Sequence, residues 1–115
     1  MTDTCIRCGG FLFEQCPNCR PPSMDALQEK VGTWATTTFP QSTDESKLKH
    51  LQREVKELLE SGKPEEAADC ALILMHYAHA HGFSLFDECR KKFEIAKKRK
   101  WGAPDGEGVQ EHIRE

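Results

Sequence analysis

The sequence predicts an all-α domain over residues 23–115, preceded by a small cysteine-rich module with its linker over residues 1–22. Two observations near the middle of the chain predict helices. Apolar side chains recur there at spacings of three and four, the period of a helix with one buried face. Gly62 then suits the residue just past a helix C-terminus, and Pro64 suits the first turn of the next helix. A connection this short makes the two helices antiparallel neighbours.

Start and stop signals predict the other elements. Ser23 caps a first helix, and residues 42–45 (STDE) form a capping box that starts the second. Between them, residues 35–41 (ATTTFPQ) are rich in β-branched side chains and are expected to form an extended connection. Ser84 opens the last helix, and Gly102–Gly108 is expected to be a loop. The residues expected on the buried stripes are Leu27, Val31 and Trp34; Leu48, Leu51, Val55 and Leu58; and Leu85, Phe86, Cys89, Phe93 and Ala96.

The composition excludes several functional classes. The chain has 115 residues, 30% of them charged and 37% hydrophobic, with a net charge of −3, so no overall basic field indicates nucleic-acid binding. No apolar run reaches the roughly 18 residues of a membrane span, and the N-terminus has no signal-peptide pattern. A cytoplasmic protein without membrane contact is therefore expected.

Four of the six cysteines form a CxxC–x7–CxxC pattern in the N-terminal module. Paired CxxC units in an intracellular chain indicate metal binding rather than disulfides, and four thiolates suit a tetrahedral structural Zn²⁺ site. The predicted zinc ligands are Cys5, Cys8, Cys16 and Cys19. The other two, Cys70 and Cys89, are expected to be buried small hydrophobic residues.

Two acidic pairs lie on the predicted antiparallel helices. Glu54 and Glu57 are three residues apart on the first helix, and Glu66 and Asp69 repeat this spacing on the second. Four carboxylates converging from facing helices suit hard cations such as Mg²⁺. The alternative is that each pair belongs to a solvated face. The apolar run from Ala67 to Ala80 indicates a buried helix and argues against it, because an unpaired Asp69 there would be costly.

The last predicted helix has a basic C-terminal half. Lys92 and Arg99 are seven residues apart, two turns along one face, where they could hold a triphosphate. The alternative is a solvated face that complements the helix dipole. The sequence has no glycine-rich phosphate-binding motif. A second metal site could be formed by His76, His79 and His81, but surface or packing roles are favoured for them.

These motifs together resemble the MazG-like all-α nucleoside triphosphate pyrophosphohydrolases. That family has an ExxE pair on one helix and an ExxD pair on the next, here residues 54–57 and 66–69, followed by a KxxxNxxRxW pattern that matches at Lys92, Arg99 and Trp101. Ala96 stands where the family has asparagine, which leaves one sugar or phosphate contact open. Over residues 24–113 the chain is most similar to the phage dATP/dGTP pyrophosphohydrolases of the MazZ type. The cysteine module lies outside the resemblance.

The resemblance implies a MazG-like helical bundle and a reaction. Two or three Mg²⁺ or Mn²⁺ ions held by Glu54, Glu57, Glu66 and Asp69 would activate a water that attacks the α-phosphorus of a purine dNTP and releases pyrophosphate. Glu57 is assigned to orient that water or accept its proton.

The family's basic residues act on the substrate. Lys92 and Arg99 would bind and stabilise the phosphates. Trp34, Phe39 and Trp101 are candidates to stack on the base, with core packing as the alternative for each. Family members form dimers or tetramers with sites near subunit interfaces.

A zinc-ribbon adaptor that contacts nucleic acid or protein, with a helical oligomerisation domain, is the rival hypothesis. The zinc module holds only Arg7 and Arg20 as basic residues, which argues against a nucleic-acid surface. The adaptor hypothesis also leaves both acidic pairs unexplained.

Overall fold

The computed structural model describes residues 23–114 and consists of helices there, without a strand. The helices are α1 (Met24–Thr38), α2 (Asp44–Ser61), α3 (Pro64–His81) and α4 (Leu85–Lys98). The predicted all-α class is therefore confirmed. The predicted zinc ligands Cys5, Cys8, Cys16 and Cys19 and the boundary after residue 22 lie outside the described residues.

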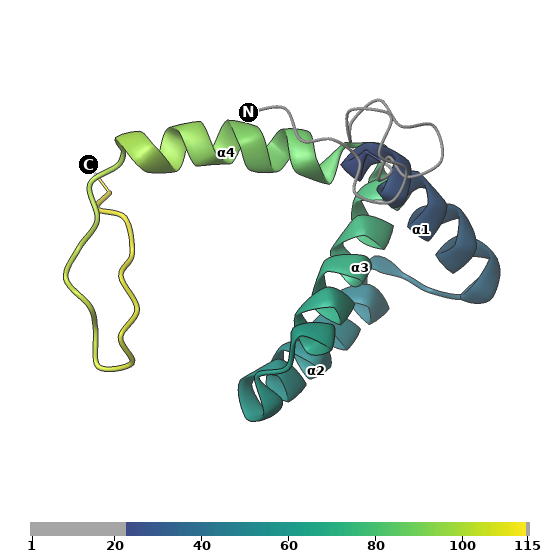
Figure 1. Ribbon diagram of the computed structural model, residues 1–115, viewed down its shortest axis with the longest axis horizontal. Helices are drawn as coiled ribbons and strands as arrows, with labels where there is room; N and C mark the ends of the chain where they lie inside the picture. Colours follow the sequence, from purple (N-terminus) through teal and green to yellow (C-terminus); the bar gives the residue numbers. More distant parts are fainter. Residues whose placement is uncertain (1–22, 115) are drawn as a thin grey trace, which may run out of the picture.

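The α2–α3 hairpin is the centre of the fold, and α1 packs on α3 (Figure 1). Gly62 has φ +66°, a left-handed conformation that ends α2, and Pro64 occupies the first turn of α3, both as predicted. At the α1–α3 contact, a Cβ on Gly32 would overlap the side chain of His79, so the two helices approach closely there. Among the described residues, the buried apolar ones are few, namely Ala35, Met75 and Ala78.

The extended connection predicted over residues 35–41 is wrong, because α1 continues to Thr38. The side chains of Thr36 and Thr37 donate hydrogen bonds to the carbonyls of Gly32 and Thr33, at 2.8 and 3.1 Å. These bonds to the preceding turn let β-branched threonines remain helical. The real break comes at Phe39 and Pro40.

The predicted details of α2 also need correction. The cap is Thr43, paired reciprocally with Ser46, one residue later than the predicted capping box. The buried stripe is rotated as well: Leu48 and Val55 are exposed, whereas Lys47 is only 7% exposed. The face of α2 that contacts the rest of the chain therefore contains a lysine that a hydrophobic pattern cannot find.

The wholly buried α3 that the apolar run predicted is only partly confirmed. Met75 and Ala78 are buried, but Ala67, Ala68 and Asp69 at the start of the helix are exposed, and Leu72 is 39% exposed. One chain does not supply enough packing partners to cover this end of the helix.

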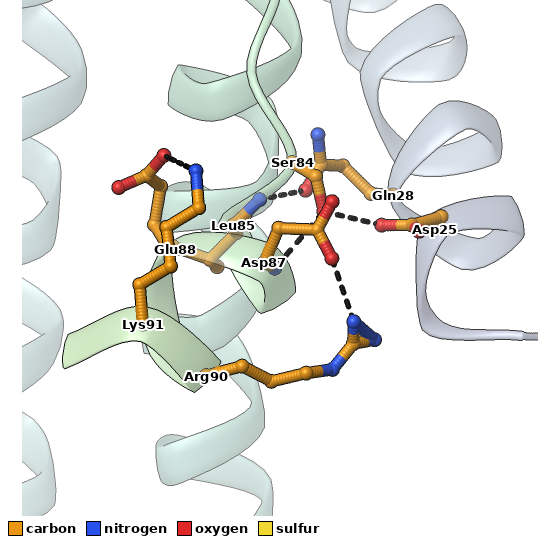
Figure 2. A network of polar contacts seen from close by, with 8 residues as sticks. All are labelled: Asp25, Gln28, Ser84, Leu85, Asp87, Glu88, Arg90 and Lys91. Atoms are coloured by element: carbon orange, nitrogen blue, oxygen red, sulfur yellow. Dashed lines mark hydrogen bonds and ion pairs between the residues drawn. The ribbon is translucent and has the colours of Figure 1, made fainter. Parts of the chain in front are cut away.

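A polar junction joins the start of α4 to α1 (Figure 2). The buried Gln28 side chain donates to the carbonyl of Phe83 at 2.7 Å and accepts from the amide of Leu85 at 2.9 Å. Ser84, the predicted cap of α4, accepts from the amide of Asp87 and donates to Asp25. These contacts fix the direction in which α4 leaves the bundle.

From this junction α4 projects away from the α2–α3 hairpin and ends in a loop held by an isolated bridge between Trp101 and His112 (Figure 1). No residue of α4 is fully buried in the described part of the chain. Of its predicted stripe, Leu85, Phe86 and Ala96 are partly covered, whereas Phe93 and Cys89 are exposed; Cys70 on α3 is partly buried. Among the described helices, none is long and apolar enough to cross a bilayer.

Candidate functional site

The α2–α3 hairpin brings the two acidic pairs together. Glu54, Glu66 and Asp69 each offer a carboxylate oxygen within 4.8 Å of the other two, which in the described part of the chain is the one such group able to hold a metal ion. Glu57, exposed on the same side of α2, raises the pKa of both Glu54 and Glu66 and so lies beside them. The antiparallel hairpin therefore brings the two acidic pairs together, as the spacing predicted.

The electrostatics of this carboxylate cluster (Glu54, Glu57, Glu66 and Asp69) are unfavourable without a cation. Burial raises the pKa of Glu54, and the neighbouring Glu57 and Asp69 raise it further, against a lowering hydrogen bond from His50 at 3.2 Å. Burial also raises the pKa of Glu66, followed by the charges of Glu57, Asp69 and Glu54. Like charges held this close disfavour ionisation.

One oxygen of the cluster has no partner at all. Oε2 of Glu54 is buried and forms no hydrogen bond. A buried carboxylate oxygen without a donor is costly, and a cation bound between the carboxylates would satisfy it. The burial predicted for Asp69 is therefore wrong: the desolvated carboxylate is Glu54 on α2, whereas Asp69 is exposed.

A cavity of about 660 Å³ opens beside the cluster, between α1, α2 and α3. This volume is in the range of small-molecule sites. Glu54 and Asp69 form part of its wall, and Lys47 and His76 form another part. The remaining lining residues are Val31, Trp34, Ala35, Phe39, Pro40, Gln41, Ser42, Ser46, His50, Leu72 and Ile73.

Two aromatic rings stand at the α1 side of the cavity. Trp34 and Phe39 meet edge to face with centroids 5.6 Å apart, and they are 59% and 48% exposed. Neither ring is a core residue of the described chain, so the packing alternative for them fails within one chain. Both rings present apolar surface to whatever enters the cavity.

Comparison with known proteins identifies the family. A family model described as dATP/dGTP pyrophosphohydrolase matches residues 27–115. The chain belongs to this family. It is accordingly a nucleoside triphosphate pyrophosphohydrolase, as the resemblance implied.

The fold has a counterpart among solved structures. The chain is similar to the cyanophage S-2L MazG-like pyrophosphohydrolase bound to dGDP and three catalytic Mn²⁺ ions per active site, with a TM-score of 0.70 and 24% identity over 83% of this chain and 97% of that one. This likeness shows a MazG-like fold. Among curated proteins the comparison finds no match.

The predicted phosphate-binding residues of this pyrophosphohydrolase, Lys92 and Arg99, lie on α4 and at its C-terminal end, away from the carboxylate cluster. Burial lowers the pKa of His112, and Arg99, Arg114 and Lys92 lower it further, so both Lys92 and Arg99 lie within electrostatic reach of His112. Arg99 is nevertheless the extended residue that ends α4, 3.5 Å from Nδ1 of His112, and not part of a helical face. Neither residue lines the cavity of its own chain, because α4 projects away from the hairpin (Figure 1).

Trp101 belongs to the same end of α4. Its indole donates to the carbonyl of Ala96 at 3.0 Å and its ring meets His112 edge to face, with centroids 6.0 Å apart. Within one chain Trp101 therefore fixes the C-terminal loop instead of reaching the cavity.

Lys47 and His50 were missed by reasoning from sequence. Their spacing to Glu54, seven and four residues, places all three on one side of α2. This regular spacing to a suspected metal ligand is the signal that could have found them.

The repulsion within the cluster predicts how the metal-free protein responds to pH. Because the pKa values of Glu54 and Glu66 are raised on folding, the folded protein binds protons that the unfolded chain has already released. Stability of the metal-free protein is therefore expected to fall as pH rises from the ordinary glutamate pKa through the raised values. Glu66→Gln should raise the melting temperature at pH 7 in EDTA and flatten this dependence.

Glu65→Gln is the matched control, because Glu65 shares the first turn of α3 and loses the same favourable contact with the helix dipole. Melting curves of the wild type and both variants across pH 4.5–8 make the comparison. A melting temperature for Glu66→Gln no higher than that of Glu65→Gln would contradict the repulsion.

Proposed function

We propose that this protein hydrolyses a purine deoxynucleoside triphosphate, dGTP or dATP, to the monophosphate and pyrophosphate with Mg²⁺ or Mn²⁺. The observation that carries the proposal is a four-carboxylate cluster at the wall of a cavity of about 660 Å³ lined by aromatic and apolar side chains. Carboxylates suit the cations that accompany a triphosphate, and the aromatic wall suits a base. The family description names dATP and dGTP, and the S-2L relative binds dGDP with Mn²⁺.

Glu54, Glu66 and Asp69 would hold the cations, with Glu57 beside them. The unpartnered Oε2 of Glu54 and the raised pKa values of Glu54 and Glu66 support this donor set. A divalent cation bound there supplies positive charge to the triphosphate oxygens and lowers the pKa of a bound water.

Glu57 and His50 have separate roles in the proposed hydrolysis. Water attacks the α-phosphorus, the bond to the oxygen that bridges the α- and β-phosphorus breaks, and pyrophosphate leaves with that oxygen. Glu57 accepts the proton of the attacking water, since it is an exposed carboxylate beside the cluster and is not one of the three whose oxygens converge on the metal position. His50 positions Glu54 through their 3.2 Å hydrogen bond.

Lys92 and Arg99 would serve the active site of a neighbouring subunit. Their α4 leaves its own bundle, while an apolar stripe on α2, formed by Leu48, Val55 and Leu59, is exposed in one chain. Leu59 is 86% exposed, which is costly for a monomer and suits a homodimer or tetramer. In such an assembly the basic end of α4 would bring positive charge to the partner's triphosphate.

The N-terminal module is proposed to hold a structural Zn²⁺ through Cys5, Cys8, Cys16 and Cys19, as a unit separate from the catalytic domain from residue 23 onward. An adaptor function based on this module would leave the converged carboxylates and the adjoining cavity without a role, so the hydrolase is preferred.

Release of pyrophosphate from a panel of dNTPs and NTPs tests the proposal. Cleavage of dGTP or dATP is expected with Mg²⁺ or Mn²⁺ and not with EDTA. Glu66→Gln and Asp69→Asn should each lower turnover by at least about 100-fold, because metal ligands supply several kcal/mol of transition-state stabilisation. Glu65→Gln should remain active. Full activity of both ligand variants would contradict the assignment of the cluster.

Mixing two inactive variants tests whether α4 acts on its neighbour. Asp69→Asn and Arg99→Ala subunits, unfolded and refolded together, should recover roughly a quarter of wild-type activity if the protein is a dimer, because about half of the dimers are mixed and each mixed dimer has one intact site. Lys97→Ala is the control, because it removes an exposed lysine of α4 that pairs with Glu94. This variant should be active when refolded alone, without mixing with a second variant. A mixture as inactive as its parents would show that Arg99 does not act across subunits.

A further inference from the structure

Lys47 is a lysine of the cavity wall that forms no ion pair with the described carboxylates. Its side chain lies in the cavity wall, and the residue is only 7% exposed. Among the described residues, no carboxylate lies within 4.0 Å of its ammonium. Because this side chain lines the cavity, its ammonium is within reach of a ligand that offers an acceptor.

The position of Lys47 along the hairpin separates it from the carboxylates. Lys47 is seven residues before Glu54 on α2, and His76 is seven residues after Asp69 on the antiparallel α3. At 1.5 Å per residue, both offsets are about 10 Å in the same direction, away from the Gly62 turn. The cavity therefore has an acidic end at Glu54 and Asp69 and a cationic end at Lys47 and His76.

The cationic end carries one positive charge at neutral pH. Burial lowers the pKa of His76, and the charges of Lys47 and His79 lower it further, so His76 is held as a neutral imidazole. Lys47 is thus the one lysine or arginine in the cavity wall, and it offers donors without an acceptor.

The wall between the two ends suits a base better than phosphates. Leu72 and Ile73 lie between the two ends on α3, and Val31, Trp34 and Phe39 also line the cavity. These side chains offer a triphosphate no charged donor, and His50, which lies between the ends on α2, is hydrogen-bonded to Glu54. With the phosphates at the acidic end, where cations would bind, the base is the part of a nucleotide left to extend about 10 Å toward Lys47.

We propose that Lys47 selects guanine by donating from its ammonium to O6 and N7 of the base, which makes this a dGTP-preferring enzyme. Guanine offers two acceptors, O6 and N7, on this edge, whereas adenine offers N7 beside an amino donor that an ammonium repels. The proposal rests on the nucleotide hydrolysis proposed above and names the residue that reads the base.

Lys47→Met is the decisive variant, because it keeps the unbranched stem and removes the charge. It should lower kcat/KM for dGTP by about 10- to 100-fold, the range for loss of one specific lysine–guanine contact, and change that for dATP by less than about threefold. Retained hydrolysis of dATP shows that the variant is folded. Lys49→Met is the matched control, since Lys49 is an exposed lysine two residues along α2 that pairs with Glu45.

Base analogues test the same contact without a mutation. dITP keeps O6 and N7 and should behave as dGTP does with the wild type, whereas 2-aminopurine deoxyribonucleoside triphosphate lacks O6 and should behave as dATP does. Lys47→Met should erase the difference between the two analogues.

Two results would overturn the assignment. If Lys47→Met lowers kcat/KM equally for dGTP and dATP, the ammonium contacts the phosphates and not the base. If it lowers kcat/KM for neither, Lys47 does not contact the substrate. If the wild type cleaves no dNTP, the proposed hydrolysis itself fails. In that case, calorimetry of dGMP and dAMP binding tests the contact between Lys47 and the base. If the ratio of the dGMP affinity to the dAMP affinity is the same in the wild type and in Lys47→Met, Lys47 does not select guanine.

Discussion

Repulsion between carboxylates on facing helices is the constraint on which the rest of this structure depends. The αL glycine at Gly62 and the proline at Pro64 fold α2 and α3 into a hairpin, and the i, i+3 spacings aim both acidic pairs at one place. The result is a buried Glu54 oxygen without a partner and two carboxyl groups with raised pKa values. We expect such a cluster to weaken the metal-free fold, and bound cations would balance its charge.

The same hairpin explains the shape of the cavity. Because α2 and α3 run antiparallel, an offset of seven residues on each helix leads from the acidic end to Lys47 and His76. The helix α1, held against α3 through the close contact at Gly32, closes the third side with Trp34 and Phe39. The cavity therefore has carboxylates at one end, a lysine at the other, and Leu72 and Ile73 between them on α3.

Much of this could be predicted from the sequence, and the failures have physical reasons. Gly62, Pro64 and the acidic spacings are local signals, so the hairpin and the convergence of the pairs followed from them. The burial of Lys47 and the exposure of Leu48 were not predictable, because periodicity finds a face of α2 but not its rotation against α1 and α3. Thr36 and Thr37 are helical because their hydroxyls donate to the preceding turn, and these hydrogen bonds outweigh the preference of β-branched residues for extended structure.

The central claim, that the carboxylate cluster binds divalent cations, is tested most directly by titrating the protein with Mn²⁺ in the presence of dGMP and following free Mn²⁺ by electron paramagnetic resonance. Mn²⁺ prefers carboxylates to thiolates, so the cysteine module does not obscure the result. The account predicts binding by the wild type and by Glu65→Gln that is lost in Asp69→Asn. Equal binding by the wild type and Asp69→Asn would contradict it.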